Sequence, residues 1–393
     1  MTAIPWILDR STPQAFDPIF APTPSGSCAT TPWHTLVLNA GRMIEAGNPA
    51  LAARIAGMVL TYSPATGSPA VRLARVFANA LLDRQELAGY TPAIDHRRVP
   101  SQDDRRQAAS ALIERTPIVR FGHQVAVAAI AEALEGEASA HVIDLGIGSG
   151  GQWSLLFQRL AARGVCRDLR LTGIDLPAPG SDPERRLRRT GAWLLSEAAR
   201  FGIELDWHGI ARPLEILRPE DLCLCDGEPL IFNAAASLHR LHDETVDVKN
   251  PRDRLLGLIH SLEPRLFTLV EAEASHGHLT LAPRLSESLR YYGAIFDVLQ
   301  ATLAASDPDR DLIEQALLGR EIRNLVAARG RDRVMRQERH DDWAFRLAWR
   351  GFEAIDLVQH QPEIDAAMGL AKPLELRSTE DALTLCYDGN PIV

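Results

Sequence analysis

Closely spaced glycines after Asp144 carry the strongest chemical signal in this sequence. Asp144 ends a short apolar run, and Gly146, Gly148 and Gly150 follow at alternate positions. Glycine is favoured where a strand turns sharply into a helix and where the backbone passes close to a ligand. The pattern therefore predicts a ligand-binding turn, with Asp144 and the three glycines as contacts.

Two nucleotide cofactors are compatible with this turn. The pattern Asp-x-Gly-x-Gly-x-Gly resembles the first motif of Rossmann-like S-adenosylmethionine (SAM) methyltransferases. Gly146, Gly148 and Gly151 also satisfy Gly-x-Gly-x-x-Gly, the dinucleotide fingerprint, which is weak on its own. We favour SAM because Asp144 stands two residues before the first glycine, where a nicotinamide site usually carries an apolar residue. A tight turn that binds nothing is the third alternative.

Four further residues near the ends of expected strands could complete a cofactor site. Asp175 ends the second strand and could accept both ribose hydroxyls. Trp207 and His208 could flank an adenine, because an aromatic ring stacks well on a base, although a half-buried structural Trp207 is an equal alternative. Asn233 ends the fourth strand, where a polar side chain would face the cofactor or the methyl group.

A histidine and a carboxylate could provide base catalysis. His239 lies in Ala-Ser-Leu-His-Arg-Leu-His-Asp-Glu (236–244), which resembles a stretch of many small-molecule O-methyltransferases, whose histidine deprotonates the acceptor hydroxyl. An unperturbed imidazole titrates near pH ~6.5 and can act as a base at neutrality. Glu271 or Glu273 could orient its second nitrogen. The alternative is that His239 packs against and caps a strand–helix junction.

Five residues are candidates for contacts with a substrate between the core and a helical cap: Arg120, His123, Glu273, Tyr291 and Tyr292. Tyr292 falls on an apolar helical stripe, so packing in the core is its default role. Glu273, His276 and His278 lack the regular spacing of a metal site, and we expect no metal. The arginine-rich run 329–339 also contains acids and is expected to be a solvated face.

Composition limits the class of protein and its partners. The 393 residues are 46% hydrophobic and 24% charged, with a formal net charge of −9. This charge disfavours nucleic acid as the main partner, and five scattered cysteines suggest a reducing compartment. No apolar run approaches membrane-spanning length, and the first ten residues lack the order of a signal peptide. We expect a cytoplasmic protein with a small-molecule partner, and leave a homodimer open.

Alternating strand and helix patterns predict a doubly wound, mostly parallel seven-stranded Rossmann-like methyltransferase sheet with an α-helical cap. The expected strands are 140–145, 169–175, 203–210, 229–234, 266–271, 349–358 and 382–393, the last with an Asp388-Gly389 turn. The expected organisation is a flexible arm (1–32), a helical cap (33–120), a first core part (121–275), a helical insertion joining the cap (276–345) and a C-terminal core hairpin (346–393).

The sequence from Trp33 to Val393 resembles the GRAS family, known best from plant transcriptional regulators and also found in bacteria. His141-Val-Ile-Asp144 is similar to the family's central Val-His-Ile-Ile-Asp motif, and Leu238-His-Arg-Leu241 to its Leu-His-Arg-Leu element. Val270-Glu-Ala-Glu273 resembles Val-Glu-Gln-Glu, and Gly319-Arg-Glu-Ile-Arg-Asn324 resembles the segment named for Pro-Phe-Tyr-Arg-Glu. The closing Ser-Ala-Trp motif of plant members is absent.

The resemblance implies a SAM-methyltransferase-like core with a helical cap. The full glycine pattern and the acidic charge suggest a bacterial member that kept its cofactor site. Two functions then remain. One is a SAM-dependent methyltransferase of a small molecule, with O- or N-methylation in a cap–core cleft. The alternative is a non-catalytic regulatory module that senses a small molecule or binds a protein partner and retains a SAM-like pocket.

Overall fold

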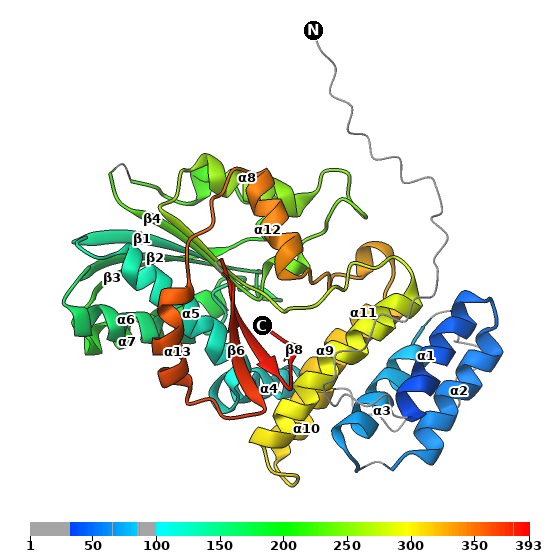
Figure 1. Ribbon diagram of the computed structural model, residues 1–393. Helices are drawn as coiled ribbons and strands as arrows, with labels where there is room; N and C mark the ends of the chain where they lie inside the picture. Colours follow the sequence, from blue (N-terminus) through cyan, green and yellow to red (C-terminus); the bar gives the residue numbers. More distant parts are fainter. Residues whose placement is uncertain (1–31, 65, 85, 87–99, 226, 380) are drawn as a thin grey trace.

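The computed structural model describes residues 32–64, 66–84, 86, 100–225, 227–379 and 381–393 (Figure 1). The expected N-terminal arm therefore lies outside the described residues, apart from Pro32. The described chain forms an α/β core with a layer of helices beside it (Figure 1).

A five-stranded parallel sheet occupies the centre of the core, in the order β3-β2-β1-β4-β5. Its strands are β1 (Ser139–Leu145), β2 (Asp168–Asp175), β3 (Glu204–Ala211), β4 (Leu230–Ala235) and β5 (Leu266–Val270). The register places Asp144 between Gly173 of β2 and Asn233 of β4. The carboxyl ends of these strands therefore bring Asp144 and Asn233 into one row.

Helices cover both faces of this sheet. One face carries α5 (Pro117–Ala133), α6 (Gly151–Arg163) and α7 (Arg185–Arg200), and the other carries α8 (Pro251–Ser261) and α12 (His340–Trp349) (Figure 1). Successive β1 side chains enter opposite layers, because Val142 packs with Trp153 and Leu156 of α6 whereas Ile143 packs with residues of α8. The sheet is therefore doubly wound, as the strand–helix alternation predicts.

The expected seven-stranded sheet is wrong. The C-terminal residues instead form a separate antiparallel sheet of β6 (Leu374–Ser378), β7 (Leu383–Tyr387) and β8 (Asn390–Pro391). The expected strand 349–358 is absent: Trp349 is the last residue of α12, and residues 350–357 pair with no strand of the described chain. Gly351, with φ of 95°, then follows the end of the helix in the left-handed conformation that glycine favours. Its successors form an irregular segment and a 3-10 turn, η7 (Val358–His360).

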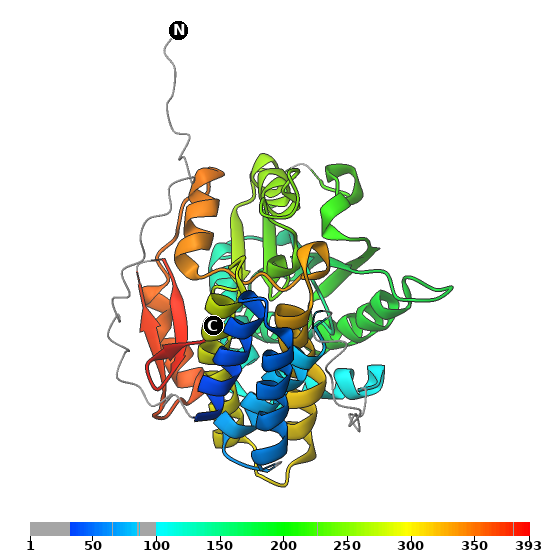
Figure 2. The ribbon, with the colours of Figure 1, turned by 90° about the vertical axis from the view of Figure 1, so that its right-hand side faces the viewer.

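Segments from both halves of the chain build the helical layer. The first half supplies α1 (Pro32–Glu45), α2 (Pro49–Tyr62) and α3 (Pro69–Leu82). The second half supplies α9 (Leu281–Thr302), α10 (Pro308–Leu312), the π-helical turn η5 (Ile313–Leu318) and α11 (Gly319–Ala327). In this layer α1 packs on α9, and α3 packs on both α9 and α11 (Figure 2). A further helix, α4 (Gln102–Arg115), packs on α5, α10 and η5.

Candidate functional site

The glycine turn joins β1 to α6, as the sequence predicts. Gly146, Gly148 and Gly150 have φ values of 141°, 53° and 80°, which L side chains rarely adopt. The backbone of this turn therefore requires glycine whether or not a ligand binds there.

Side chains of the protein itself lie close to this turn. A Cβ on Gly146 would come within 2.8 Å of the Ser237 Cβ, and one on Gly150 within 3.1 Å of Leu194. The Thr190 hydroxyl of α7 donates to the Gly148 carbonyl oxygen at 2.9 Å. Close packing against α7 and the loop after β4 therefore supplies a second reason for small residues at this turn.

Asp144 and Asn233 point into the layer between the sheet and α6. The indole N–H of Trp153 donates to Asp144 Oδ2 at 2.8 Å, and the amide of Gln152 donates to Asn233 Oδ1 at 3.1 Å. Asp144 is 3% exposed, and its other oxygen has no hydrogen-bond partner among the described residues. Burial raises the pKa of Asp144 to about 7, and the hydrogen bond from Trp153 partly opposes this rise.

The remaining predicted cofactor residues lie at the end of β2 and along β3, and each already contacts a neighbouring residue of the protein. Asp175 ends β2, where its Oδ1 accepts from the Leu176 backbone N–H at 2.7 Å. Trp207 pairs with Leu171, four residues before that end, and its ring packs against Gly173 and Gly191. A Cβ on Gly191 would lie 2.1 Å from the indole Nε1. His208 lies beside Asp206 at 3.3 Å, and its side chain is 42% exposed.

Some of these contacts are compatible with a bound SAM molecule, and others occupy the space or the atoms that SAM would use. The positive φ angles and the acid at the end of β2 are compatible with the cofactor. In contrast, the Trp207 ring fills space between β2 and α7, and Asp144 Oδ2 is bound to Trp153. SAM binding at this turn stays a prediction, which titration calorimetry with the full chain would test.

His239 and Glu271 do come together, as predicted from the sequence. The His239 Nδ1 lies 2.6 Å from Glu271 Oε2, and both side chains are 5% exposed. Glu271 Oε1 also accepts from the backbone N–H groups of Leu238 and His239, at 2.8 and 3.2 Å. Burial opposes ionisation of Glu271, but the charge and hydrogen bonds of His239 hold its pKa below the ordinary value.

The contacts of Glu271 give the pair a definite structural role. Its two N–H bonds fix the 3-10 turn η4 (Leu238–Arg240) that follows β4, whereas Glu271 itself follows β5. The pair therefore ties the ends of neighbouring strands together. The His239 Nε2 is buried without a hydrogen-bond partner among the described residues, so the geometry also leaves this atom available for a proton transfer.

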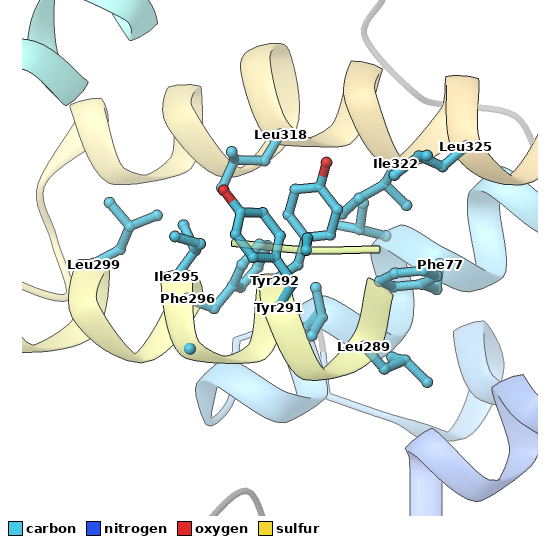
Figure 3. Packing of buried hydrophobic residues seen from close by; sticks show 14 of the residues in the cluster. Phe77, Leu289, Tyr291, Tyr292, Ile295, Phe296, Leu299, Leu318, Ile322 and Leu325 are labelled. Atoms are coloured by element: carbon cyan, nitrogen blue, oxygen red, sulfur yellow. The ribbon is translucent and has the colours of Figure 1, made fainter. Parts of the chain in front are cut away.

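Aromatic rings of α9 extend this buried polar region towards α11. The Tyr292 hydroxyl donates to Glu321 at 3.2 Å, and its ring stacks on His276 with 5.9 Å between centroids. Figure 3 shows the hydroxyl ends of Tyr291 and Tyr292 pointing towards the helix of Leu318 and Ile322. Burial lowers the pKa of His276 to about 4 and raises the pKa of both tyrosines.

The other predicted substrate contacts lie elsewhere. Arg120 is exposed on α5 and His123 is half-buried, with a pKa that burial lowers to about 4. Glu273 Oε2 accepts from the His340 backbone N–H at 2.8 Å, and the Glu273 side chain lines a cavity beside β5. The structure therefore does not bring Arg120 or His123 to the His239–Glu271 pair.

Two buried arginines near the His239–Glu271 pair were not among the site residues predicted from the sequence. Arg252 is fully buried, donates to the carbonyl oxygens of His239, Leu241 and Arg336, and pairs with Glu338 at 2.8 Å. Arg336 is 1% exposed and donates to the Thr245 hydroxyl at 2.9 Å.

The run 329–339 is therefore not simply the solvated face that was expected. Arg333, Arg336 and Gln337 are buried in it. Arg333 donates to the His276 carbonyl oxygen, Arg336 donates to the Thr245 hydroxyl, and the Gln337 Oε1 lies 2.8 Å from the His276 Nδ1. In the sequence, this run shows only that its apolar residues lack the periodicity of a helix or a strand. That feature indicates a loop and gives no sign of burial.

Both the sequence and the fold of this chain match one known family. The GRAS domain family model matches residues 33–393. The crystal structure of SCL7 from Oryza sativa superposes with a TM-score of 0.80 at 28% identity, covering 92% of this chain and 98% of that one. This chain belongs to the GRAS domain family.

Curated relatives add similarity at the level of sequence. Scarecrow-like transcription factor PAT1 of Arabidopsis thaliana is 33% identical over 295 residues, which cover 74% of this chain and 60% of PAT1. Scarecrow-like protein 5 of the same plant is 35% identical over 288 residues, or 72% of this chain and 48% of that protein. The chain thus spans about half to three fifths of these two relatives.

These findings correct four expectations from the sequence. The small-molecule methyltransferase function is wrong, because the similar protein PAT1 of Arabidopsis thaliana is named as a transcription factor. The expected small-molecule partner is not supported for the same reason. The bacterial branch is not supported, because the relatives reported above come from plants. The structural relative is a GRAS protein rather than a methyltransferase.

Proposed function

We propose that this chain is a non-catalytic regulatory module that controls transcription by binding partner proteins. The similarity to PAT1, a protein named as a transcription factor, supports this proposal. The proposal corresponds to the protein-interaction alternative that the sequence left open. It concerns the whole protein's activity, of which the matched region is one part.

The outward face of α2 is the observation that carries the proposal. Leu51, Ile55, Met58 and Tyr62 follow one another at spacings of four, three and four, which places them on one side of the helix. Leu51, Met58 and Tyr62 are 37%, 46% and 71% exposed. Contiguous exposed apolar side chains mark protein-binding surfaces, and α2 lies at the outer side of the helical layer (Figure 1).

The proposal extends to the compartment. Among the described residues, no helix has the length and apolar composition that a bilayer crossing requires. A transcriptional regulator must reach complexes assembled on DNA. We therefore place the protein where those complexes form, in contrast to the purely cytoplasmic location expected from the sequence.

A tethering experiment tests the function. The full chain is fused to a heterologous DNA-binding domain, and transcription of a reporter with matching sites is measured. We expect the fusion to change reporter output and Met58→Glu with Tyr62→Glu to abolish that change. Val248→Glu is the matched control, since Val248 is 97% exposed but lies in the loop after η4, away from α2. A fusion without effect on the reporter would contradict the proposal.

A further inference from the structure

A groove runs along the free edge of the central sheet. β5 hydrogen-bonds with β4 on one side, and no strand of the described chain pairs with its other side. A cavity of about 920 Å³ lies beside this edge and is lined by all five residues of β5. We call it the β5-edge groove. An unpaired strand edge of this kind presents backbone donors and acceptors that a further strand can use.

Two helices form apolar walls on either side of the groove. Gly122 and Val125 of α5 line one wall, and Leu347 and Ala348 of α12 line the other. Because these helices cover opposite faces of the sheet, a strand added to β5 would meet apolar side chains on both of its faces. Strands buried on both faces have continuous apolar sequences rather than alternating ones.

Acidic side chains surround the same groove. Glu263, Glu273, Glu353 and Asp381 all line it. Glu273 accepts from the backbone N–H of His340, which also lines the groove, and Asp381 lies 3.3 Å from the His340 ring. Arg265 also lines it, but its charge is offset by Glu137 at 2.6 Å. Glu263 and Glu353 are exposed and have no ion-pair partner among the described side chains. The groove therefore carries an excess of negative charge, which favours a ligand with cationic ends.

We propose that the β5-edge groove binds an extended peptide segment of a partner protein by adding it as a strand to β5. The segment has about four or five consecutive apolar residues, matching the length of β5, with Lys or Arg on either side. Backbone hydrogen bonds to β5 supply affinity, and the apolar walls and acidic rim supply selectivity. This surface is distinct from the exposed face of α2.

Synthetic peptides test the ligand chemistry with the full chain. The probe is fluorescein-labelled Lys-Lys-Val-Ile-Val-Phe-Lys-Lys, and binding is followed by fluorescence anisotropy. One control has proline at the first and third apolar positions, which removes backbone donors. A second control has Glu in place of each Lys. We expect both controls to bind at least tenfold more weakly. Equal binding of either control, or no binding of the basic probe, would overturn the proposal.

Protein variants test the location of the site. Ala348→Trp fills the groove from α12 and is expected to weaken binding of the basic probe at least tenfold. Ala199→Trp, at an exposed position of α7, is the matched control and is expected to change affinity less than twofold. Glu263→Gln with Glu353→Gln should weaken binding and reduce its salt dependence without blocking the groove, so it serves if Ala348→Trp fails to fold. Unchanged affinity in this double variant would contradict the proposal that the acidic side chains of the groove contribute to binding.

Amide hydrogen exchange separates this proposal from the one on α2. Probe binding should slow exchange in 266–270 and leave 49–62 unchanged. Protection confined to 49–62 would place the peptide on α2 and overturn the groove proposal. An unlabelled peptide copying residues 3–10 of this chain provides a further test. If it displaces the probe at lower concentration than the unlabelled probe itself does, the occupant is the chain's own segment rather than a partner.

Discussion

The Nδ1 of His239 lies 2.6 Å from Oε2 of Glu271, and this contact joins the turn after β4 to the end of β5. The same carboxylate accepts two backbone N–H groups of η4, so one side chain holds three donors. Buried backbone N–H groups need a hydrogen-bond acceptor, and in a loop after a strand no neighbouring strand supplies one. A buried carboxylate such as Glu271 can then accept from them.

Removal of Glu271 should destabilise the fold strongly. Glu271→Ala leaves the three donors unsatisfied and is expected to lower the free energy of unfolding by about 3–5 kcal/mol. Glu271→Gln keeps an acceptor oxygen and should cost less. Urea denaturation measures both, with Glu263→Ala as an exposed control expected to stay within about 0.5 kcal/mol. A loss below 1 kcal/mol (roughly the worth of one ordinary hydrogen bond) in Glu271→Ala would show that water replaces these bonds.

Asp144 should make stability depend on pH. Its pKa is raised from 3.8 to about 7 in the folded protein, so the folded state binds this proton more tightly than the unfolded state. The stabilisation is fully present below about pH 4 and is lost as the pH rises through about 7. Asp144→Asn removes this loss, and its stability relative to the parent protein should rise by about 2–4 kcal/mol from pH 4 to pH 8. Denaturation curves at both pH values check this, and an unchanged difference would contradict it.

Arg252 is expected to be essential for the packing of the loop after β4. It is 0% exposed, and Arg252→Met would remove its hydrogen bonds to three carbonyl oxygens, of which that of His239 keeps the Arg336 backbone N–H, and would deprive Glu338 of one cation. We expect a loss of about 3–5 kcal/mol. Arg331→Met is the control, since Arg331 is 65% exposed in its ion pair with Asp247 and should contribute about 1 kcal/mol or less. If both variants lost a similar free energy of unfolding, the burial of Arg252 would not explain its contribution to stability.

Gly191 and Trp207 should be energetically coupled. Gly191→Ala places a Cβ against the indole and is expected to cost about 1–3 kcal/mol, as overpacking usually does. In a Trp207→Leu background the same change should be neutral or stabilising by up to about 1 kcal/mol, because alanine favours the helix. A double-mutant cycle measures the coupling. Additive effects would mean that the ring moves away without cost.

The sequence predicted best the features that depend on neighbouring residues. The five parallel strands and the glycine turn follow from short apolar runs and from the backbone requirements of Gly146, Gly148 and Gly150. The pairing of His239 with Glu271 was also predicted, because both follow strands whose ends meet at one edge. These residues are fixed by local pattern and by the rules of parallel sheets.

The features that depend on distant segments were not predicted. Arg336 is buried against Asp243 and Thr245, which lie about 90 residues earlier in the chain, and nothing in its own neighbourhood in the sequence indicates that contact. The expected strand 349–358 failed because its apolar residues after Trp349 pair with no strand of the described chain and form an irregular segment, and a short apolar run does not reveal whether a partner strand exists. The β7–β8 hairpin at Asp388-Gly389 was predicted, whereas the pairing of β6 with β7 in a separate sheet was not, because the sequence pattern alone does not determine it.

The packing of α1 to α3 against α9 and α11 has a consequence for biosynthesis. The first three helices leave the ribosome about 200 residues before α9, which at ~5–20 residues per second is a delay of about 10–40 s. During that interval Leu73, Phe77 and Leu81 lack the surface that later buries them. The nascent chain therefore exposes an adhesive apolar face, and chaperone dependence should be greatest in this early phase of translation.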